Sequence, residues 1–275
     1  MKKNNSILLS TPYIIWMLLF TLIPLGVVGY YALTDPATGQ FTFSNIKELG
    51  MYMPVLWRSI YYSLVSAVIC LLLGYPVAYF MAHRSPFAQK FLYMLVMLPI
   101  CMSFLLRTMA WVGLLQDTGI INQFLEWIGL GHVQLIRTPG AVILGMVYNY
   151  LPYMILPLYS TIVKIDRRLV EAAEDLGCNG VQVFKRVVLP LSMPGILTGI
   201  TMVFVPAVST FYISQKMGSA DMVLIGDIIE RQFKQGNNAN LGAALSLVLM
   251  LLVFVCTGIM NRFGNKNDGE GGDIL

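Results

Sequence analysis

Long apolar stretches that contain no Asp, Glu or Lys dominate the sequence, and each is long enough to cross a lipid bilayer. A membrane-spanning helix needs about 20 residues, whereas the strands of a membrane barrel would show alternating segments of about ten. One basic residue, Arg107, interrupts the third stretch. The pattern therefore predicts an all-α, polytopic membrane protein with six transmembrane helices at residues 7–33, 59–82, 91–115, 139–163, 188–214 and 240–260.

Charged residues are few and lie mainly between the apolar stretches. They make up 12% of the chain, against about 25% in soluble domains, which excludes an ordinary soluble domain. We expect residues 1–263 to form one transmembrane domain and the Gly-rich residues 264–275 to be a disordered tail. With the N-terminus inside, 11 of the 18 Lys and Arg residues are cytoplasmic, which predicts that both termini are cytoplasmic. The excess of basic residues behind the net charge of +4 lies where the membrane topology requires it, so we expect no nucleic-acid partner.

No cluster of side chains in the sequence indicates catalysis or metal binding. The four cysteines show no CxxC spacing, and His83 and His132 fall on opposite sides of the membrane. No predicted span contains a carboxylate, as a proton-coupled pump would require, and no P-loop occurs. We therefore predict no catalytic residue, no metal and no cofactor on this chain, so any ATP would bind to another subunit. Arg107 is expected to extend to the outer membrane interface.

The most informative segment is the inner loop at 164–187. Asp166 can cap a short helix that Gly177 ends, and Arg167 and Arg168 can pair with Glu171. A second short helix is expected near 181–188. The first helix can dock on another protein, lie on the lipid surface or pack on its own bundle. Its apolar stripe comprises Leu169, Ala172, Ala173 and Leu176.

The loop sequence resembles the EAA signature of permease subunits of bacterial ABC importers. Glu171-Ala172-Ala173 is followed at the usual spacing by Gly177 and by Val187-Val188-Leu189-Pro190, with Val187 where isoleucine is more usual. The resemblance implies a coupling helix that docks on an ATP-binding subunit. It implies that Leu169, Glu171, Ala172, Ala173, Leu176, Gly177, Leu189 and Pro190 couple this chain to the ATPase.

The same resemblance implies a multi-chain importer in the bacterial inner membrane. A related permease chain would pair with this one, and a dimer of ATP-binding subunits would hold ATP and Mg. A binding protein outside the membrane would deliver the substrate, and the outer segments 116–138 and 215–240 are long enough to meet it.

Three further segments resemble those of spermidine/putrescine permeases, which implies polyamine transport: Leu156–Ser160, Leu191–Ile196 and Phe211–Ser214. Aromatic rings and polar oxygens can hold an amine in a low-dielectric region. The candidates for such a passage are Tyr148, Asn149, Tyr150 and Tyr153 in the fourth helix, and Ser209, Thr210, Tyr212 and Ser214 in the fifth. The alternative is that these polar groups only bridge helices.

Other functions remain open at this level. An ABC permease for an inorganic anion, ferric iron or an amino acid would share the same loop signature. An ion-coupled secondary transporter would need no ATPase.

Overall fold

The computed structural model describes residues 3–35, 39–42, 44–234 and 238–269. All its regular elements in these ranges are helical, apart from an isolated β-bridge between Thr34 and Phe41. Five helices are long and apolar enough to span a membrane, or six if a bent pair counts as one span. The predicted all-α, polytopic fold is therefore confirmed.

The chain divides into two compact units. The first contains residues 1–54 and 228–252, and the second contains residues 55–227 and 253–275. In chain order the long helices are α1 (Lys3–Ala32), α2 (Ser44–Ala82), α3 (Pro86–Cys101), α6 (Pro139–Ile162), α9 (Leu189–Val208) and α12 (Ala239–Gly269). The shorter helices are α4 (Phe104–Leu115), α5 (Ile120–Trp127), α7 (Arg167–Asp175), α8 (Gly180–Val183), α10 (Tyr212–Met217) and α11 (Ile225–Lys234).

Two buried asparagines organise the first unit. The Nδ2 of Asn45 donates to the carbonyls of Ala32 and Thr34, at 3.2 and 3.0 Å. The Nδ2 of Asn240 donates to the same Thr34 carbonyl at 2.6 Å. Since an exposed carbonyl at a helix end needs a donor, these amides fasten the end of α1 to α2 and α12.

The core of the second unit is the tight contact between α6 and α9. A Cβ placed on Gly195 would lie 2.6 Å from Oγ1 of Thr161, and one on Gly199 would lie 2.6 Å from Sδ of Met154. Small residues at such positions let two helix backbones approach closely. In the same unit the hydroxyls of Tyr75 and Ser192 lie 2.8 Å apart and join α2 to α9.

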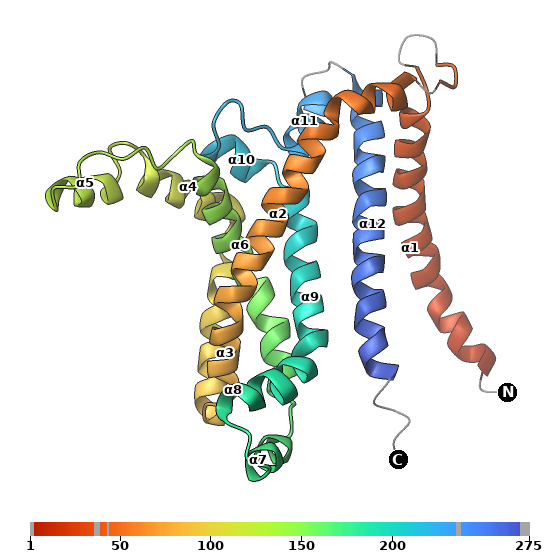
Figure 1. The fold of residues 1–275 in the computed structure, drawn as a ribbon. Coiled ribbons are helices and arrows are strands. Elements are labelled where there is room, and N and C mark those ends of the chain that lie inside the picture. The colour runs from red at the N-terminus through yellow and green to blue at the C-terminus, as the bar shows by residue number, and fades with distance from the viewer. Residues whose placement is uncertain (1–2, 36–38, 43, 235–237, 270–275) are drawn as a thin grey trace. The chain divides into compact units, whose positions relative to one another are not determined.

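The third predicted span is broken, which corrects the expectation of one helix over 91–115. α3 ends at Cys101, and the segment from Phe104 to Trp127 turns by 87° from its direction. Pro99 lies inside the last turn of α3, where it removes a backbone donor and favours a break. α4 and α5 consequently lie at the end of the second unit opposite α7 (Figure 1).

Other boundaries also differ from prediction. α2 begins at Ser44 rather than at residue 59, and α9 ends at Val208 rather than at residue 214. Residues 264–269 of the predicted disordered tail continue α12, while residues 270–275 lie outside the described residues.

Candidate functional site

Two regions of the second unit carry the residues singled out in the sequence. One is the segment around α7, at one end of the unit. The other is a groove lined by residues of α4 and α10, helices that lie toward the opposite end (Figure 1). Each is built from helix ends, where backbone groups and polar side chains need partners other than the helix itself.

The helix α7 begins and ends as its sequence predicts. An Asp166 carboxylate oxygen accepts a hydrogen bond from the Arg168 N–H at 3.0 Å. Gly177 has a φ of +82°, the Cys178 N–H donates to the Ala173 carbonyl at 3.1 Å, and the Gly177 N–H donates to the Glu174 carbonyl at 2.8 Å. This is the Schellman arrangement, in which a left-handed residue closes the helix.

The predicted ion pairs of α7 do not form. In the part of the chain that the structure describes, neither Arg167 nor Arg168 lies within 4.0 Å of the Glu171 carboxylate. The side chain of Arg167 instead lines a cavity of about 160 Å³ together with His83, Gln89 and Val170. α7 therefore meets its own bundle through its Arg167 and Val170 side.

The opposite side of α7 keeps its apolar residues uncovered. Leu169 and Leu176 are 50% and 85% exposed, Ala172 and Glu171 are exposed, and Ala173 is half-buried. Exposed leucines beside small alanines form a shallow apolar stripe on a helix that has no fully buried residue. A surface of this kind is suited to docking.

The link from α7 to α9 contains a wide turn that the sequence analysis did not predict. α8 starts with a capping box between Asn179 and Gln182 and leads into a π-helical turn, Phe184–Val188. Leu189 is half-buried and Pro190 is exposed at the start of α9. Pro190 has no N–H and its ring clashes with the carbonyl four residues earlier, so a locally wider turn accommodates it.

The groove is formed where α4, α6 and α10 meet the end of α9. It has a volume of about 330 Å³. Of the predicted passage residues, it brings together four, one from α6 and three from the chain between the end of α9 and the start of α10. Its lining comprises Phe104, Leu105, Tyr150, Ser209, Thr210, Phe211 and Tyr212.

The surface of the groove is mainly apolar and aromatic, and the Tyr150 and Ser209 hydroxyls beside it are bonded to backbone carbonyls. The Tyr150 hydroxyl donates to the Pro206 carbonyl at 3.3 Å, and Ser209 donates to the Val205 carbonyl at 3.2 Å. The Tyr212 and Phe104 rings have centroids 6.2 Å apart. The ammonium of Lys216 lies 6.0 Å from the Tyr212 ring centroid, which is the geometry of a cation–π contact.

The remaining passage candidates do not line the groove. Asn149 is completely buried and its Nδ2 donates to the Gly145 carbonyl at 2.9 Å and to Thr108 Oγ1 at 3.4 Å. Ser214 is buried and donates to the Phe211 carbonyl at 2.9 Å. Asn149 thus joins α6 to α4, as the helix-bridging alternative describes, whereas Ser214 bonds to Phe211 at the start of its own helix.

Two tyrosines of α6 also lie outside the groove lining. Tyr148 is half-buried, with its ring centroid 5.3 Å from that of Trp111, and Tyr153 is half-buried. Because α9 ends at Val208, Tyr212 and Ser214 belong to the separate helix α10.

Arg107 is buried, contrary to the expectation that it extends to the membrane interface. It is 5% exposed, and its Nε and Nη1 have no hydrogen-bond partner. Its spacing from Thr108, Trp111 and Leu115 places it on the packed face of α4. The groove residues Phe104 and Leu105 were not predicted either, because the turn after Cys101 brings them there. Phe211 was not predicted as a groove residue, and it lies directly before α10.

The comparisons with known proteins agree with this architecture. Residues 74–267 match the family described as "Binding-protein-dependent transport system inner membrane component". The chain is 38% identical over 247 residues to the spermidine/putrescine transport system permease protein PotB of Escherichia coli, covering 86% of this chain and 90% of that protein. It is 40% identical over 253 residues to PotB of Haemophilus influenzae, covering 87% and 88%.

Solved structures share the fold at lower identity. A bacterial ABC transporter that imports the acidic polysaccharide alginate matches with a TM-score of 0.75 and 21% identity, over 96% of both chains. The MetNI methionine ABC transporter matches with a TM-score of 0.61 and 17% identity, over 80% of this chain and 98% of that one. From the family match and the close relatives together, the chain belongs to the inner membrane components of binding-protein-dependent transport systems and is a multi-pass permease subunit of an ABC importer.

Proposed function

We propose that this chain is one half of the permease of a polyamine importer in the bacterial inner membrane. The observation that carries the substrate assignment is the groove lined by aromatic rings, one of which, Tyr212, has the Lys216 ammonium 6.0 Å from its centroid. The names of the relatives at 38–40% identity support spermidine or putrescine as the cargo.

The groove is suited to passing an amine rather than retaining it. Each cation–π contact contributes about 0.5–2 kcal/mol, and hydroxyl oxygens such as those of Ser209 and Tyr150 accept hydrogen bonds from ammonium groups. No carboxylate lines the groove among the described residues. Strong, selective capture therefore belongs to a binding protein outside the membrane, and the permease conducts what it receives.

The absence of a carboxylate from the described groove lining also favours pairing with a different permease chain over pairing with a second copy of this one. Desolvating the charges of a polyamine costs free energy that rings alone offset only in part. A second copy of this chain would contribute another groove without a carboxylate. A related but different permease chain can supply acidic residues on the facing wall, so we assign it that role.

Coupling to ATP is assigned to the segment from Leu169 to Pro190. The exposed stripe of Leu169, Ala172 and Leu176 is uncovered by this chain and fits a groove of an ATP-binding subunit. ATP and Mg bound to the two ATP-binding subunits would close the ATPase dimer. The docked helix α7 would move with these subunits, and the helix bundle would open to the outside. The basic residues around α7 support a cytoplasmic location for this end of the second unit, and the distribution of Lys and Arg along the sequence supports the same side for both termini.

The test is uptake of labelled spermidine by cells that lack this chain and every other polyamine route. A plasmid copy should restore uptake, and unlabelled putrescine should compete. If spermidine uptake is the same with and without the chain, the polyamine assignment is wrong, although the permease assignment stands.

An amino acid is the second candidate cargo, and one observation favours it. The Ser103 side chain makes no capping bond, so the first N–H groups of α4 remain open at Phe104 and Leu105, which line the groove. A helix N-terminus favours a carboxylate. Competition for uptake by amino acids but not by putrescine would select this alternative. Membership of the ABC family decides against an ion-coupled secondary transporter.

A further inference from the structure

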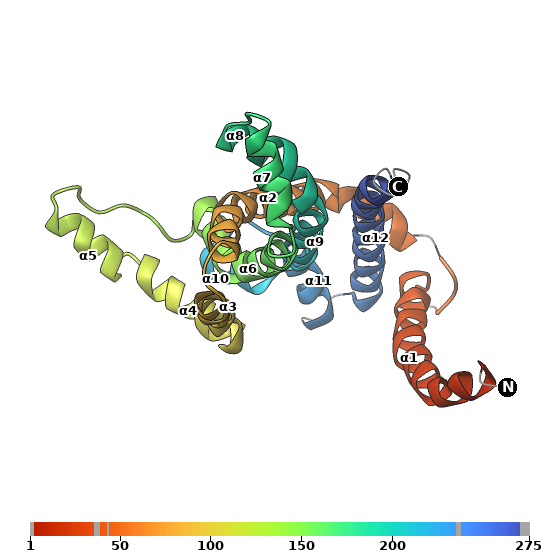
Figure 2. The same cartoon turned by 90° about the horizontal axis from the view of Figure 1, so that it is seen from below.

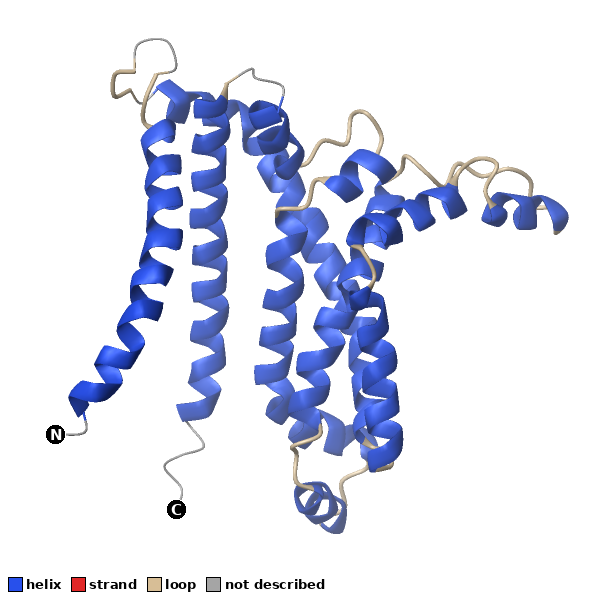
Figure 3. Ribbon diagram, turned by 180° about the vertical axis from the view of Figure 1, so that it is seen from behind, coloured by secondary structure: helices blue, strands red, loops and turns tan. Residues whose placement is uncertain are grey.

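The lateral arm, residues Phe104–Trp127, runs across the direction of the spanning helices. It turns 87° from α3 and carries α5 away from the bundle of α2, α6 and α9 (Figures 1 and 2). From behind, α5 lies at the outer end of the arm with only its own return loop beside it (Figure 3). If α3 and α4 formed one straight helix, that helix would continue along the direction of the spanning helices. The sideways direction of the lateral arm therefore needs a separate physical explanation.

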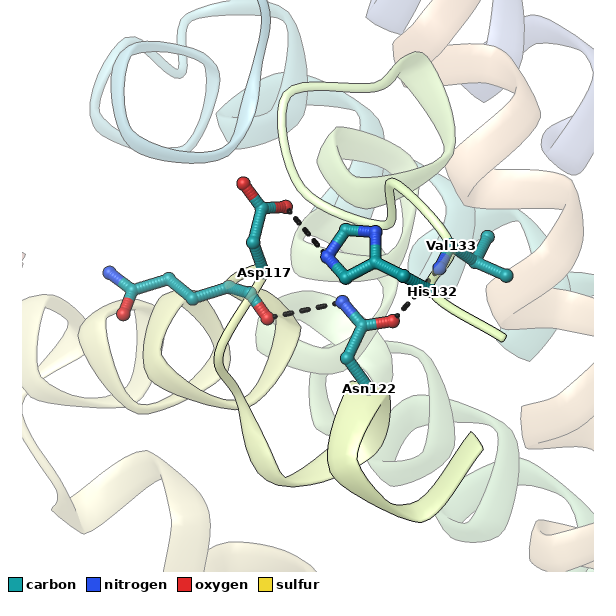
Figure 4. Close-up of polar contacts among 5 residues, drawn as sticks. Asp117, Asn122, His132 and Val133 are labelled. Carbon is teal, nitrogen blue, oxygen red and sulfur yellow. Dashed lines mark hydrogen bonds and ion pairs between the residues drawn. The ribbon is translucent and has the colours of Figure 1, made fainter. Parts of the chain in front are cut away.

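The polar side of α5 is fastened to that return loop (Figure 4). Asn122 is completely buried, its Oδ1 accepts from the Val133 N–H at 3.2 Å, and its Nδ2 donates to the Gln116 carbonyl at 3.3 Å. Beside it, His132 Nε2 lies 3.8 Å from an Asp117 carboxylate oxygen. These contacts determine which face of α5 turns away from the protein.

That outward face is apolar and uncovered. Ile120, Phe124 and Trp127 are 67%, 58% and 81% exposed. Their spacing of four and three residues places them in one stripe. The Phe124 and Trp127 rings lie 6.0 Å apart. An apolar stripe of this size is unfavourable in water and indicates a surface that something covers.

The neighbouring surface identifies what covers it. α3 has no fully buried residue, and Met94 and Leu98 are exposed. The first turn of α4 adds a further exposed apolar side chain, Leu106. α3 belongs to a segment apolar enough to span a membrane, and its uncovered apolar side chains are those expected of a lipid-facing surface. The stripe on α5 extends that lipid-facing surface at the level where the spans end.

The composition of α5 fits the boundary between lipid headgroups and acyl chains. Trp and Phe are enriched at this depth, and a helix lying there buries an apolar stripe and leaves its polar side in water. Glu126 is the only charged residue of α5 and is exposed, away from the stripe. We propose that α5 is an interfacial anchor that lies in the leaflet at the end of the bundle opposite α7.

This anchor has a consequence for the groove. Phe104 and Leu105 begin the same arm and line the groove. With α5 held in the leaflet, that wall of the groove is fixed relative to the membrane surface while α9 and α10 move in the transport cycle. The inference rests on the permease assignment alone and holds for any cargo.

Lipid-dependent fluorescence quenching tests the anchor in the assembled importer, reconstituted into nanodiscs. Cys70, Cys101, Cys178 and Cys256 are replaced by serine, and an environment-sensitive dye is attached at Trp127→Cys or, independently, at Ile120→Cys. The matched control is Glu126→Cys, on the same helix but more than 90° from the stripe. Lipids that carry a nitroxide near the headgroup are then added.

We expect at least threefold stronger quenching at both stripe positions than at Glu126→Cys, unchanged by the binding protein. Equal quenching at the three positions would overturn the proposal. So would a stripe dye that lipid leaves unquenched but that responds to the binding protein or cross-links to the partner permease. Those results would assign the stripe to a protein contact. Spermidine uptake is not part of this readout, so failure of the anchor and failure of the polyamine assignment are distinguishable.

Discussion

Tyr212 offers the groove an aromatic face, and Lys216 already lies at cation–π distance from it. An incoming amine would compete with Lys216 for this ring. The ring rather than the hydroxyl group provides the attraction, since the quadrupole of the aromatic face attracts cations. Substitutions at Tyr212 can therefore separate ring from hydroxyl.

Tyr212→Leu should raise the concentration of spermidine that half-saturates uptake, by about 2- to 30-fold, which corresponds to losing one cation–π contact. Tyr212→Phe should retain most of the wild-type behaviour. Initial uptake rates over a range of spermidine concentrations, normalised to the amount of permease in the membrane, provide the measurement. If the half-saturating spermidine concentration rises equally in both variants, the hydroxyl group and not the ring provides the attraction.

Arg107 presents a buried charge with two unpaired nitrogens. Burying an unpaired guanidinium is costly, and an apolar side chain of similar length avoids that cost. We expect Arg107→Met to insert normally and to keep or raise the thermal unfolding temperature of the purified assembly. A clear decrease would show that Arg107 has a partner supplied by another chain, by lipid or by water.

At the scale of helices, α7 acts as a unit that starts at Asp166 and stops at Gly177. The positive φ of Gly177 is strained for most side chains but is tolerated by asparagine. Open space surrounds its Cα, so a side chain there would point into the surface that is proposed to dock.

Gly177→Asp should abolish uptake while the chain still inserts, because it places a charge on the docking surface. In Gly177→Asn the new side chain is nearly the same size as aspartate, accepts the left-handed conformation and adds no charge. This variant should therefore keep much of the uptake activity. Uptake and co-purification of the ATPase subunit measure the two variants. Normal uptake by the aspartate variant would contradict the coupling assignment.

The pairing of α6 with α9 depends on close backbone approach at Gly195. A Cβ there would meet Thr161 Oγ1 at 2.6 Å and the Pro157 carbonyl at 3.0 Å, so Gly195→Ala should destabilise the assembly by about 1–3 kcal/mol. Gly113→Ala in α4, with nothing within 4 Å of its Cβ, is the matched control and should be neutral or stabilising. Thermal unfolding of the two purified variants distinguishes them, and equal stability would refute the close-packing argument.

At the scale of the molecule, the proposed function makes this chain one of two permease halves. We expect native mass spectrometry of the purified importer to find one copy of this chain, one related permease chain and two ATP-binding subunits. Two copies of this chain and no second permease would contradict the heterodimer and, with it, the argument that carboxylates come from the facing chain.

Much of the architecture followed from local patterns. Uncharged runs indicated the membrane helices because a bilayer excludes unpaired polar groups. The ends of α7 at Asp166 and Gly177 followed from capping, which depends on a few adjacent residues. The family match and the relatives then confirmed the ABC permease family that the sequence resemblance had indicated.

Only the tertiary structure decided which polar residues share a surface. Asn149 and Tyr150 are neighbours in sequence. Asn149 is nevertheless buried against α4, whereas Tyr150 lines the groove. The break after Cys101 turned Arg107 inward and left Trp127 at the outer end of an arm. Hydropathy acts along one continuous stretch of chain and capping along a few adjacent residues, so the sequence alone determined the all-helical membrane fold and the ends of α7. Side-chain neighbours in a bundle depend on helix rotation and bending, which are set by packing between distant segments.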